Sequence, residues 1–435
     1  MKKHPLQDIV SLQKQGIPKG VFSVCSANRF VIETTLEYAK MKGTTVLIEA
    51  TCNQVNQFGG YTGMTPADFR EMVFSIAEDI GLPKNKIILG GDHLGPNPWK
   101  GQPSDQAMRN AIEMIREYAK AGFTKLHLDA SMRLADDPGN ENEPLNPEVI
   151  AERTALLCLE AERAFKESAG SLRPVYVIGT DVPPPGGAQN EGKSIHVTSV
   201  QDFERTVELT KKAFFDHGLY EAWGRVIAVV VQPGVEFGNE HIFEYDRNRA
   251  RELTEAIKKH PNIVFEGHST DYQTAKALKE MVEDGVAILK VGPALTFALR
   301  EAFFALSSIE KELFYDTPGL CSNFVEVVER AMLDNPKHWE KYYQGEEREN
   351  RLARKYSFLD RLRYYWNLPE VRTAVNKLIT NLETKEIPLT LISQFMPMQY
   401  QKIRNGLLRK DPISLIKDRI TLVLDDYYFA THPEC

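Results

Sequence analysis

"KIILGGDH", residues 86–93, is a short apolar run that ends in two glycines, an acid and an imidazole. Its apolar part is nearly continuous and does not alternate with polar residues, which is typical of a strand buried on both faces. Seven further runs of the same kind occur along the first 300 residues. The eight runs are 20–26, 44–51, 86–93, 125–131, 175–183, 225–234, 262–270 and 287–294.

The segments between these runs carry helix signals. Residues 104–123, "SDQAMRNAIEMIREYAKAGF", have an apolar stripe at helical spacing, and Gly122 is a helix stop. A second helix is expected to begin after Asn146 as its N-cap, with Pro147 in its first turn.

Eight strands that alternate with helices predict a (β/α)8 barrel over residues 1–300. An open doubly wound sheet is the alternative, but no strand leads into a GxGxxG nucleotide loop. The strand signals stop near residue 300. Residues 301–435 are therefore expected to form a helical extension packed on the barrel.

The composition excludes some classes of protein. The 435 residues carry a formal net charge of −7, whereas a general nucleic-acid binder is usually basic. No apolar run approaches the roughly 20 residues that a membrane helix needs, and the start "MKKHPLQDIV" lacks the apolar centre of a signal peptide. Five scattered cysteines without a CxxC motif are read as free thiols, so we expect a cytoplasmic protein.

In a (β/α)8 barrel the functional site lies where strands end and the following loops begin. All eight expected strand ends carry polar residues. We assign acid–base roles to Asp92, Asp129 and Glu266, and metal binding to His93, His268 and Asp181. We assign substrate binding to Asn28, Glu49, Gln54, Ser131, Gln232, Ser269, Asp271, Lys290, Gly292 and Arg354.

The metal assignment depends on where the two histidines lie. Taken singly, the Asp92–His93 pair is more typical of a turn or N-cap. Together, His93 and His268 are expected at one rim, and imidazole nitrogen suits zinc or a similar divalent ion such as Mn, Co or Mg. His127 lies inside an apolar run and is read as a core histidine, and the remaining histidines as surface residues.

Two stretches could hold an anionic substrate group. "KVGPALTFALREA" follows the eighth strand, where Gly292 and Lys290 could bind a phosphate at a helix N-terminus; the alternative is a plain tight turn. "RLARKYSFLDRLRYYW", 351–366, interleaves arginines, among them Arg354, with aromatic residues. It could close over a sugar phosphate, or simply be a helix that docks on the barrel or on another subunit. We expect the chain to form a homo-oligomer.

Several long motifs resemble one known family. "LIEATCNQVNQFGGYTGMTPADFR", "LGGDHLGPNPW", "HLDASM", "YVIGTDVPPPGGA", "VVVQPGVEF", "EGHSTDYQT", "LKVGPALTFALREA" and "LISQFMPMQY" are similar to the Z-subunit family of bacterial D-tagatose-1,6-bisphosphate aldolase. The resemblance covers essentially the whole chain. It implies a barrel related to class II aldolases, a place in tagatose or galactitol metabolism, and a separate catalytic subunit as partner.

The resemblance also implies roles for particular residues. Asp92 and His93 match the pair that supplies a base and a metal ligand in class II aldolases, and His268 matches a later ligand. A further histidine is expected on the sixth strand, where this chain has Gln232. The third ligand is then a carboxylate, such as Asp129, Asp181 or Glu236, or the site is degenerate.

Three functions remain open on these grounds. The first, which we favour because a pure scaffold has no need for polar residues at all eight strand ends, is a metal-dependent 4-epimerase that interconverts fructose 6-phosphate and tagatose 6-phosphate by retro-aldol cleavage and re-addition, a route that some relatives of the family suggest. The second is a non-catalytic subunit that stabilises a catalytic aldolase subunit. The third is an aldolase active by itself. A kinase is not supported, because the chain has neither a Walker loop nor a kinase glycine loop followed by its lysine.

Overall fold

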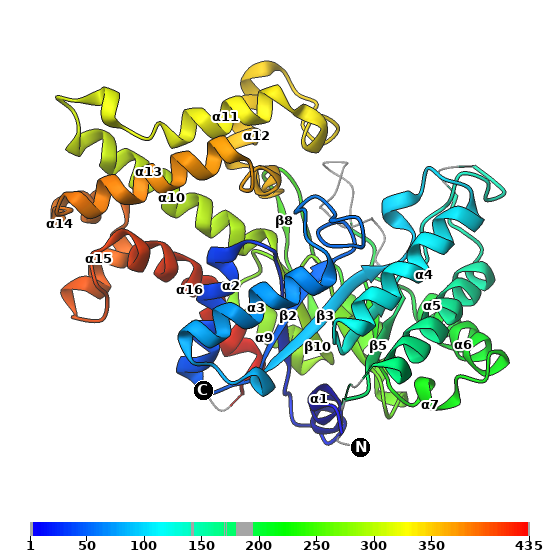
Figure 1. Cartoon of the computed structure of the whole chain (residues 1–435). Coiled ribbons are helices and arrows are strands. Elements are labelled where there is room, and N and C mark those ends of the chain that lie inside the picture. The colour runs from blue at the N-terminus through cyan, green and yellow to red at the C-terminus, as the bar shows by residue number, and fades with distance from the viewer. Residues whose placement is uncertain (1–2, 141–142, 169, 171, 180–194, 434–435) are drawn as a thin grey trace.

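A computed structural model describes residues 3–140, 143–168, 170, 172–179 and 195–433 of the chain. Eight parallel strands close into a barrel in the order β1-β2-β3-β4-β5-β6-β9-β10, which confirms the predicted (β/α)8 fold and makes the open-sheet alternative wrong (Figure 1). The strands are β1 (Val21–Cys25), β2 (Val46–Thr51), β3 (Ile87–Leu94), β4 (Lys125–Leu128), β5 (Val175–Ile178), β6 (Val226–Val231), β9 (Val264–Gly267) and β10 (Val286–Val291). A short antiparallel pair, β7 (Glu236–Phe237) and β8 (Ile242–Phe243), follows β6.

Helices cover the outside of the barrel, and their starts follow the expected capping signals. Asn146 and Pro147 begin α5, and Thr65 caps α3 in a capping box with Asp68. The helices between strands are α2 (Arg29–Lys42), α3 (Pro66–Ile80), α4 (Ser104–Lys120), α5 (Pro147–Glu167), α6 (Val200–Asp216), α7 (Tyr220–Trp223), α8 (Arg247–Ala256) and α9 (Ala275–Glu283). A further helix, α1 (Pro5–Lys14), lies under the barrel at the bottom of Figure 1.

Helices also dominate the chain after β10. They are α10 (Pro293–Leu313), α11 (Phe324–Asp334), α12 (Glu347–Tyr356), α13 (Pro369–Thr384), α14 (Leu389–Phe395), α15 (Pro397–Arg404) and α16 (Pro412–Thr431). Helices α11 to α14 extend away from the barrel at the upper left of Figure 1. The division into a barrel to residue 300 and an extension beyond it stays a prediction.

The last helix, α16, returns to the barrel wall. Tyr427 donates its hydroxyl to the carbonyl of Thr270 at 2.8 Å, next to β9, and the carbonyl of Thr431 accepts from Gly20 at 3.2 Å, before β1. Tyr38 of α2 donates to Asp425 at 2.8 Å. Helix α16 therefore fills the place between α9 and α2 that the eighth helix of a barrel usually takes, because α10 leads outward.

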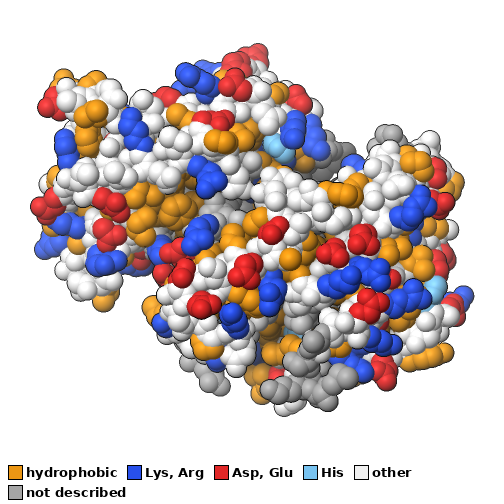
Figure 2. Space-filling model, in the orientation of Figure 1, with side chains coloured by type: hydrophobic (Ala, Val, Ile, Leu, Met, Phe, Trp, Pro, Cys, Tyr) orange, Lys and Arg blue, Asp and Glu red, His pale blue; other side chains and the backbone are white. Residues whose placement is uncertain are grey.

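The surface is mixed in charge. On the face drawn in Figure 2, lysines and arginines alternate with acids over the helices. Within the described part of the chain, every helix is too short or too polar to span a lipid bilayer.

Candidate functional site

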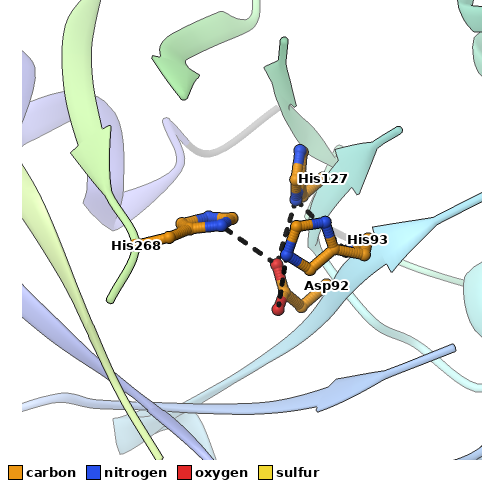
Figure 3. Close-up of side chains that lie close together, drawn as sticks. All are labelled: Asp92, His93, His127 and His268. Carbon is orange, nitrogen blue, oxygen red and sulfur yellow. Dashed lines mark hydrogen bonds and ion pairs between the residues drawn. The ribbon is translucent and has the colours of Figure 1, made fainter. Parts of the chain in front are cut away.

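Four polar side chains meet inside the barrel near the carboxyl ends of its strands. Asp92 and His93 lie near the end of β3, His127 lies on β4, and His268 follows β9 (Figure 3). All four are buried, and one possible ligand atom from each lies within 4.8 Å of the others. The imidazole centroids are 4.7 to 5.2 Å apart. This arrangement is a donor set that could hold a metal ion.

The backbone is strained at this cluster. His93 has φ +46° and Ser269 has φ +52°, a left-handed conformation that residues other than glycine rarely adopt. Such strain persists only where the surrounding structure enforces it, and it is concentrated at functional sites. Here it turns the side chains at the ends of β3 and β9 toward each other.

Asp92 is the centre of the cluster. Its Oδ1 lies 3.0 Å from Nδ1 of His127 and 3.9 Å from Nε2 of His268, and its Oδ2 lies 2.6 Å from Nζ of Lys290. Burial raises the pKa of Asp92, but His93 and Lys290 outweigh it and hold that pKa well below its usual range. The carboxylate is therefore ionised at neutral pH.

Each of two histidines has a carboxylate behind it. Nδ1 of His93 donates to Asp129 at 2.8 Å, and Asp129 in turn accepts from the hydroxyl of Ser131 at 2.6 Å. Nε2 of His268 lies 2.9 Å from Oε1 of Glu266. Carboxylates of this kind fix the ring orientation and the tautomer of metal-binding histidines. Burial disfavours the charged ring of His268 and lowers its pKa to about 4.

A fully buried layer of charge lies directly below. Nζ of Lys125 is 2.8 Å from Glu49 and 2.7 Å from Glu266, and all three side chains are completely buried. Nζ of Lys290 is 2.5 Å from Glu49 and so joins this layer to Asp92. Nearby acids more than offset burial and raise the pKa of both lysines, so that both are ammonium ions.

The cluster opens into a cavity of about 140 Å³ at the barrel mouth. Eight residues predicted for the site line it, namely Gln54, Asp92, His93, His268, Ser269, Asp271, Lys290 and Gly292. Cys25, Tyr61, Arg363 and Tyr364 also line it, and they were not among the assigned site residues. A smaller adjoining cavity is lined by Asn28 and shares Gln54 and Arg363 with the first.

Other assigned residues lie behind this cavity or away from it. Asp129, Ser131, Glu49 and Glu266 support residues that face it, through the contacts given above. The side chain of Gln232 accepts from the amides of Gly234 and Val235, at 2.8 and 2.9 Å, and so shapes its own loop. Asp181 lies outside the described residues.

Arg354 is not brought to the mouth, contrary to its assignment. Its guanidinium is buried on α12, 2.8 Å from Glu329 and 2.8 Å from Glu347, and lies over the ring of Trp339. These two acids neutralise it and hold the extension together. At this position the segment 351–366 joins α12 to α11 within the helical part of the chain, and a different arginine of the same segment, Arg363, reaches the cavity.

The start of α10 is not an open anion site. The amides of Gly292 and Ala294 donate to Oδ1 of Asp271, at 2.9 and 2.8 Å. This carboxylate occupies the position at the helix N-terminus where the sequence suggested a phosphate. Burial raises the pKa of Asp271 to about 6, which these two amides only partly offset.

His127 is the residue of the cluster that sequence analysis missed. It is fully buried, as a core histidine would be, but its ring faces Asp92 inside the barrel rather than apolar side chains. The only signal was its spacing, since it lies two residues after Lys125 on the same strand and two residues before Asp129, which directly follows that strand. Of the suggested carboxylate ligands, Asp129 instead binds His93, and Glu236 accepts from the amide of Phe237 at 2.9 Å.

The fold and this cluster define a (β/α)8-barrel protein with a buried group of side chains able to ligate a metal ion. The chain belongs to the D-tagatose-1,6-bisphosphate aldolase subunit GatZ/KbaZ-like family, and the sequence profile of that family matches residues 6–432. This confirms the resemblance seen in the sequence.

Individual relatives agree with this family. The chain is 50% identical over 430 residues to proteins of Salmonella dublin and Salmonella gallinarum named D-tagatose-1,6-bisphosphate aldolase subunit GatZ, covering 99% of this chain and 100% of each relative. A solved structure from Sinorhizobium meliloti 1021, described as a probable tagatose 6 phosphate kinase, is 47% identical with a TM-score of 0.87. The match covers 95% of this chain and 100% of that one.

Proposed function

We propose that this chain is a subunit of D-tagatose-1,6-bisphosphate aldolase, and that its barrel also holds a metal-dependent site for aldol-type chemistry of its own. Full-length identity of 50% to relatives named as that subunit supports the first part. The buried cluster of Asp92, His93, His127 and His268 carries the second part, because a subunit that only stabilised a partner would gain nothing from it.

The residues of the cluster fit a divalent cation. Nε2 of His127 donates to the carbonyl of Gly179 at 2.9 Å, so that Nδ1 carries a lone pair in the neutral ring. That lone pair already accepts from the amide of His93 at 3.1 Å, so the ring of His127 positions Asp92 rather than offering a free ligand atom. Nδ1 of His93 donates to Asp129, so that the lone pair of its Nε2 faces Oδ2 of Asp92 at 3.8 Å. The imidazoles of His93 and His268 would therefore hold the cation, and imidazole ligands suit zinc.

When bound, a divalent ion here would polarise the ketone oxygen of a 2-ketose. The chain's own residues would handle the proton. Asp92, ionised and held by Lys290, would accept the proton of the C4 hydroxyl as the C3–C4 bond breaks. The electron pair stays on C3, and C4 becomes the aldehyde carbon of the second fragment. Lys290, next to Asp92, would stabilise the negative charge that develops on the substrate during this step.

Retention of both fragments would turn this cleavage into an epimerisation. The aldehyde rotates, C3 attacks its other face, and Asp92 returns the proton to the new C4 oxygen. No hydride is transferred, so no nicotinamide is needed. We therefore propose 4-epimerisation of a ketohexose phosphate as the reaction of this site, and stabilisation of a catalytic aldolase subunit as the role of the whole chain.

One set of assays tests both parts. The purified chain, treated with EDTA and reloaded with Zn²⁺, Mn²⁺ or Co²⁺, is given fructose 6-phosphate, and tagatose 6-phosphate and trioses are measured. Formation of tagatose 6-phosphate by the unchanged chain, and its loss in the Asp92→Asn and His127→Ala variants, would support the epimerase. Full activity in both variants would exclude this mechanism. In parallel, the half-life of a catalytic tagatose-bisphosphate aldolase subunit is measured with and without this chain; an unchanged half-life contradicts the subunit role.

A further inference from the structure

A short segment of the helical part of the chain lies across the barrel mouth. The amide of Phe358 donates to the carbonyl of Asn239 at 3.0 Å, and the hydroxyl of Tyr272 donates to the carbonyl of Phe358 at 2.6 Å. Thr296, in the first turn of α10, donates to Asp360 at 2.6 Å. These bonds fix Phe358 and Asp360 to two loops and one helix that follow three of the barrel strands.

The 3-10 helix Arg361–Tyr364 then places one arginine at the cavity. Arg363 lines both the larger and the smaller cavity and is half-buried. Its Nη1 donates to the carbonyls of Leu359 and Asp360, and its Nη2 donates to the hydroxyl of Tyr364 at 3.1 Å. The Nε–H and one Nη2–H have no acceptor among the residues that the structure describes.

Arg363 also forms no direct ion pair with a described residue. Among the described residues, no carboxylate oxygen lies within 4.0 Å of its guanidinium, although Arg354, nine residues earlier, is paired with two glutamates. Asp360 and Asp271 act on Arg363 only from beyond ion-pair distance, so the guanidinium keeps N–H groups and charge that a bound anion could engage directly.

The pKa of the neighbouring Tyr364 reflects the electrostatic potential around Arg363. Burial alone would raise the pKa of Tyr364, but Arg363 and Arg361 outweigh it and lower that pKa below its usual value. The rings of Tyr364 and Tyr61 are 4.7 Å apart and form one wall beside the guanidinium. The potential at the Tyr364 side of the cavity is therefore positive.

We propose that Arg363 binds the phosphate of the sugar-phosphate substrate, so that the anion subsite of the barrel is supplied by the helical part of the chain and not by the start of α10. Its two remaining N–H groups can contact two phosphate oxygens, as the planar guanidinium fork favours. Asp271 already occupies the amides of Gly292 and Ala294. The substrate class rests on the proposed function, but the binding of the anion does not require turnover.

The first test uses the unmodified chain. Phenylglyoxal modification of arginines is followed by mass spectrometry with and without inorganic phosphate. We expect phosphate to slow the modification of Arg363 at least fivefold and to leave Arg109, an exposed arginine of α4, unaffected. Equal rates at Arg363 with and without phosphate would overturn the proposal.

The second test measures affinity by calorimetry with D-glucitol 6-phosphate, which lacks the ketone and cannot be cleaved, and with D-glucitol. We expect Arg363→Met to weaken the binding of D-glucitol 6-phosphate about ten- to a hundredfold, the usual range for the loss of a charge-assisted hydrogen bond. Arg363→Lys should weaken this binding less, and Arg109→Met should leave it unchanged. The affinity for D-glucitol should be the same in the unchanged protein and in all three variants. Metal content and melting temperature establish that each variant is folded.

The outcomes separate this proposal from the proposed function. If the chain neither epimerises fructose 6-phosphate nor stabilises an aldolase, but Arg363 still governs phosphate binding, the anion site stands and the reaction is wrong. If the chain is an active epimerase and Arg363→Met binds D-glucitol 6-phosphate as tightly as the unchanged protein, the anion site is wrong and the reaction stands.

Discussion

The two ends of the barrel interior are built from the same strands, but apolar side chains fill one end and charged or polar side chains fill the other. At the base, inward side chains such as Leu47, Ile88 and Val264 form an apolar cluster, which Leu6 and Val10 of α1 close from below. Two residues further along the same strands, the inward positions hold Glu49 of β2 and Glu266 of β9. A further step of two residues reaches Asp92, His127 and His268.

The apolar layer stabilises the barrel fold, whereas the charged layers position the residues of the candidate site. Side chains on a strand point to alternate faces, so a step of two residues stays inside the barrel. The apolar layer is stabilised by burial, which needs no particular partner. The charged layers are stabilised only while every ion keeps its counter-ion, and they hold Asp92 and the histidines in place. We therefore expect changes at the two ends to have different sizes and different readouts.

The largest effect is expected from Lys125→Met. The change leaves Glu49 and Glu266 fully buried without their shared cation, and breaking a buried ion pair typically costs about 3–5 kcal/mol. The free energy of unfolding is measured by urea denaturation. Lys120→Met on α4 is the control, since its pair with Glu117 is exposed and worth at most about 1 kcal/mol. A loss below about 1 kcal/mol for Lys125→Met would show that the charged layer does not depend on pairing.

Asp129→Asn is expected to act on the metal more than on the fold. The carboxylate accepts from Nδ1 of His93, and the loss of such a support typically weakens metal affinity about 10- to 100-fold. Metal affinity is measured by competition with a chromophoric chelator. Ser131→Ala removes only the hydroxyl that donates to Asp129 and should have a smaller effect. An unchanged affinity in Asp129→Asn would mean that His93 is not a ligand.

The base of the barrel has a pH dependence of its own, through His4, which is buried and not at the surface as the sequence suggested. Burial lowers the pKa of this N-cap of α1 to about 4 from its usual 6.5. Between these values the unfolded chain binds a proton that the folded chain does not, so folding stability rises with pH from 4 to 6.5 and is lost as pH falls. The contribution lost at pH 5 relative to pH 7 is about 2 kcal/mol.

His4→Asn tests this dependence because asparagine can still cap α1. The difference in unfolding free energy between pH 7 and pH 5 should shrink by about that amount in the variant. The same pH slope in both proteins would place the titration elsewhere. The measurement is made after EDTA treatment, so that metal release at the mouth does not contribute.

The fold could be predicted because each strand is buried on both faces, and this leaves a continuous apolar run that sequence alone displays. The site was harder for the same reason. Lys125 and His127 lie inside such a run, and only the barrel register shows that they face its interior. Arg354 and Arg363 share one aromatic and basic segment. Pairing with Glu329, 25 residues upstream, decides which of them reaches the cavity, and no local pattern encodes it.

Ile88→Val is expected to have the smallest effect and gives the sharpest comparison with the mouth. Ile88 and Asp92 lie on the same strand, and the loss of one buried methylene group typically costs about 0.5–1.5 kcal/mol. Metal affinity and phosphate binding should not change, because the apolar layer contacts α1 and not the cavity. Ile17→Val, at a position 43% exposed, is the control and should be nearly neutral. A change in metal affinity of more than about threefold, or roughly 0.7 kcal/mol, in Ile88→Val would show that packing at the base is transmitted along β3 to Asp92, and that the two ends of the barrel are coupled.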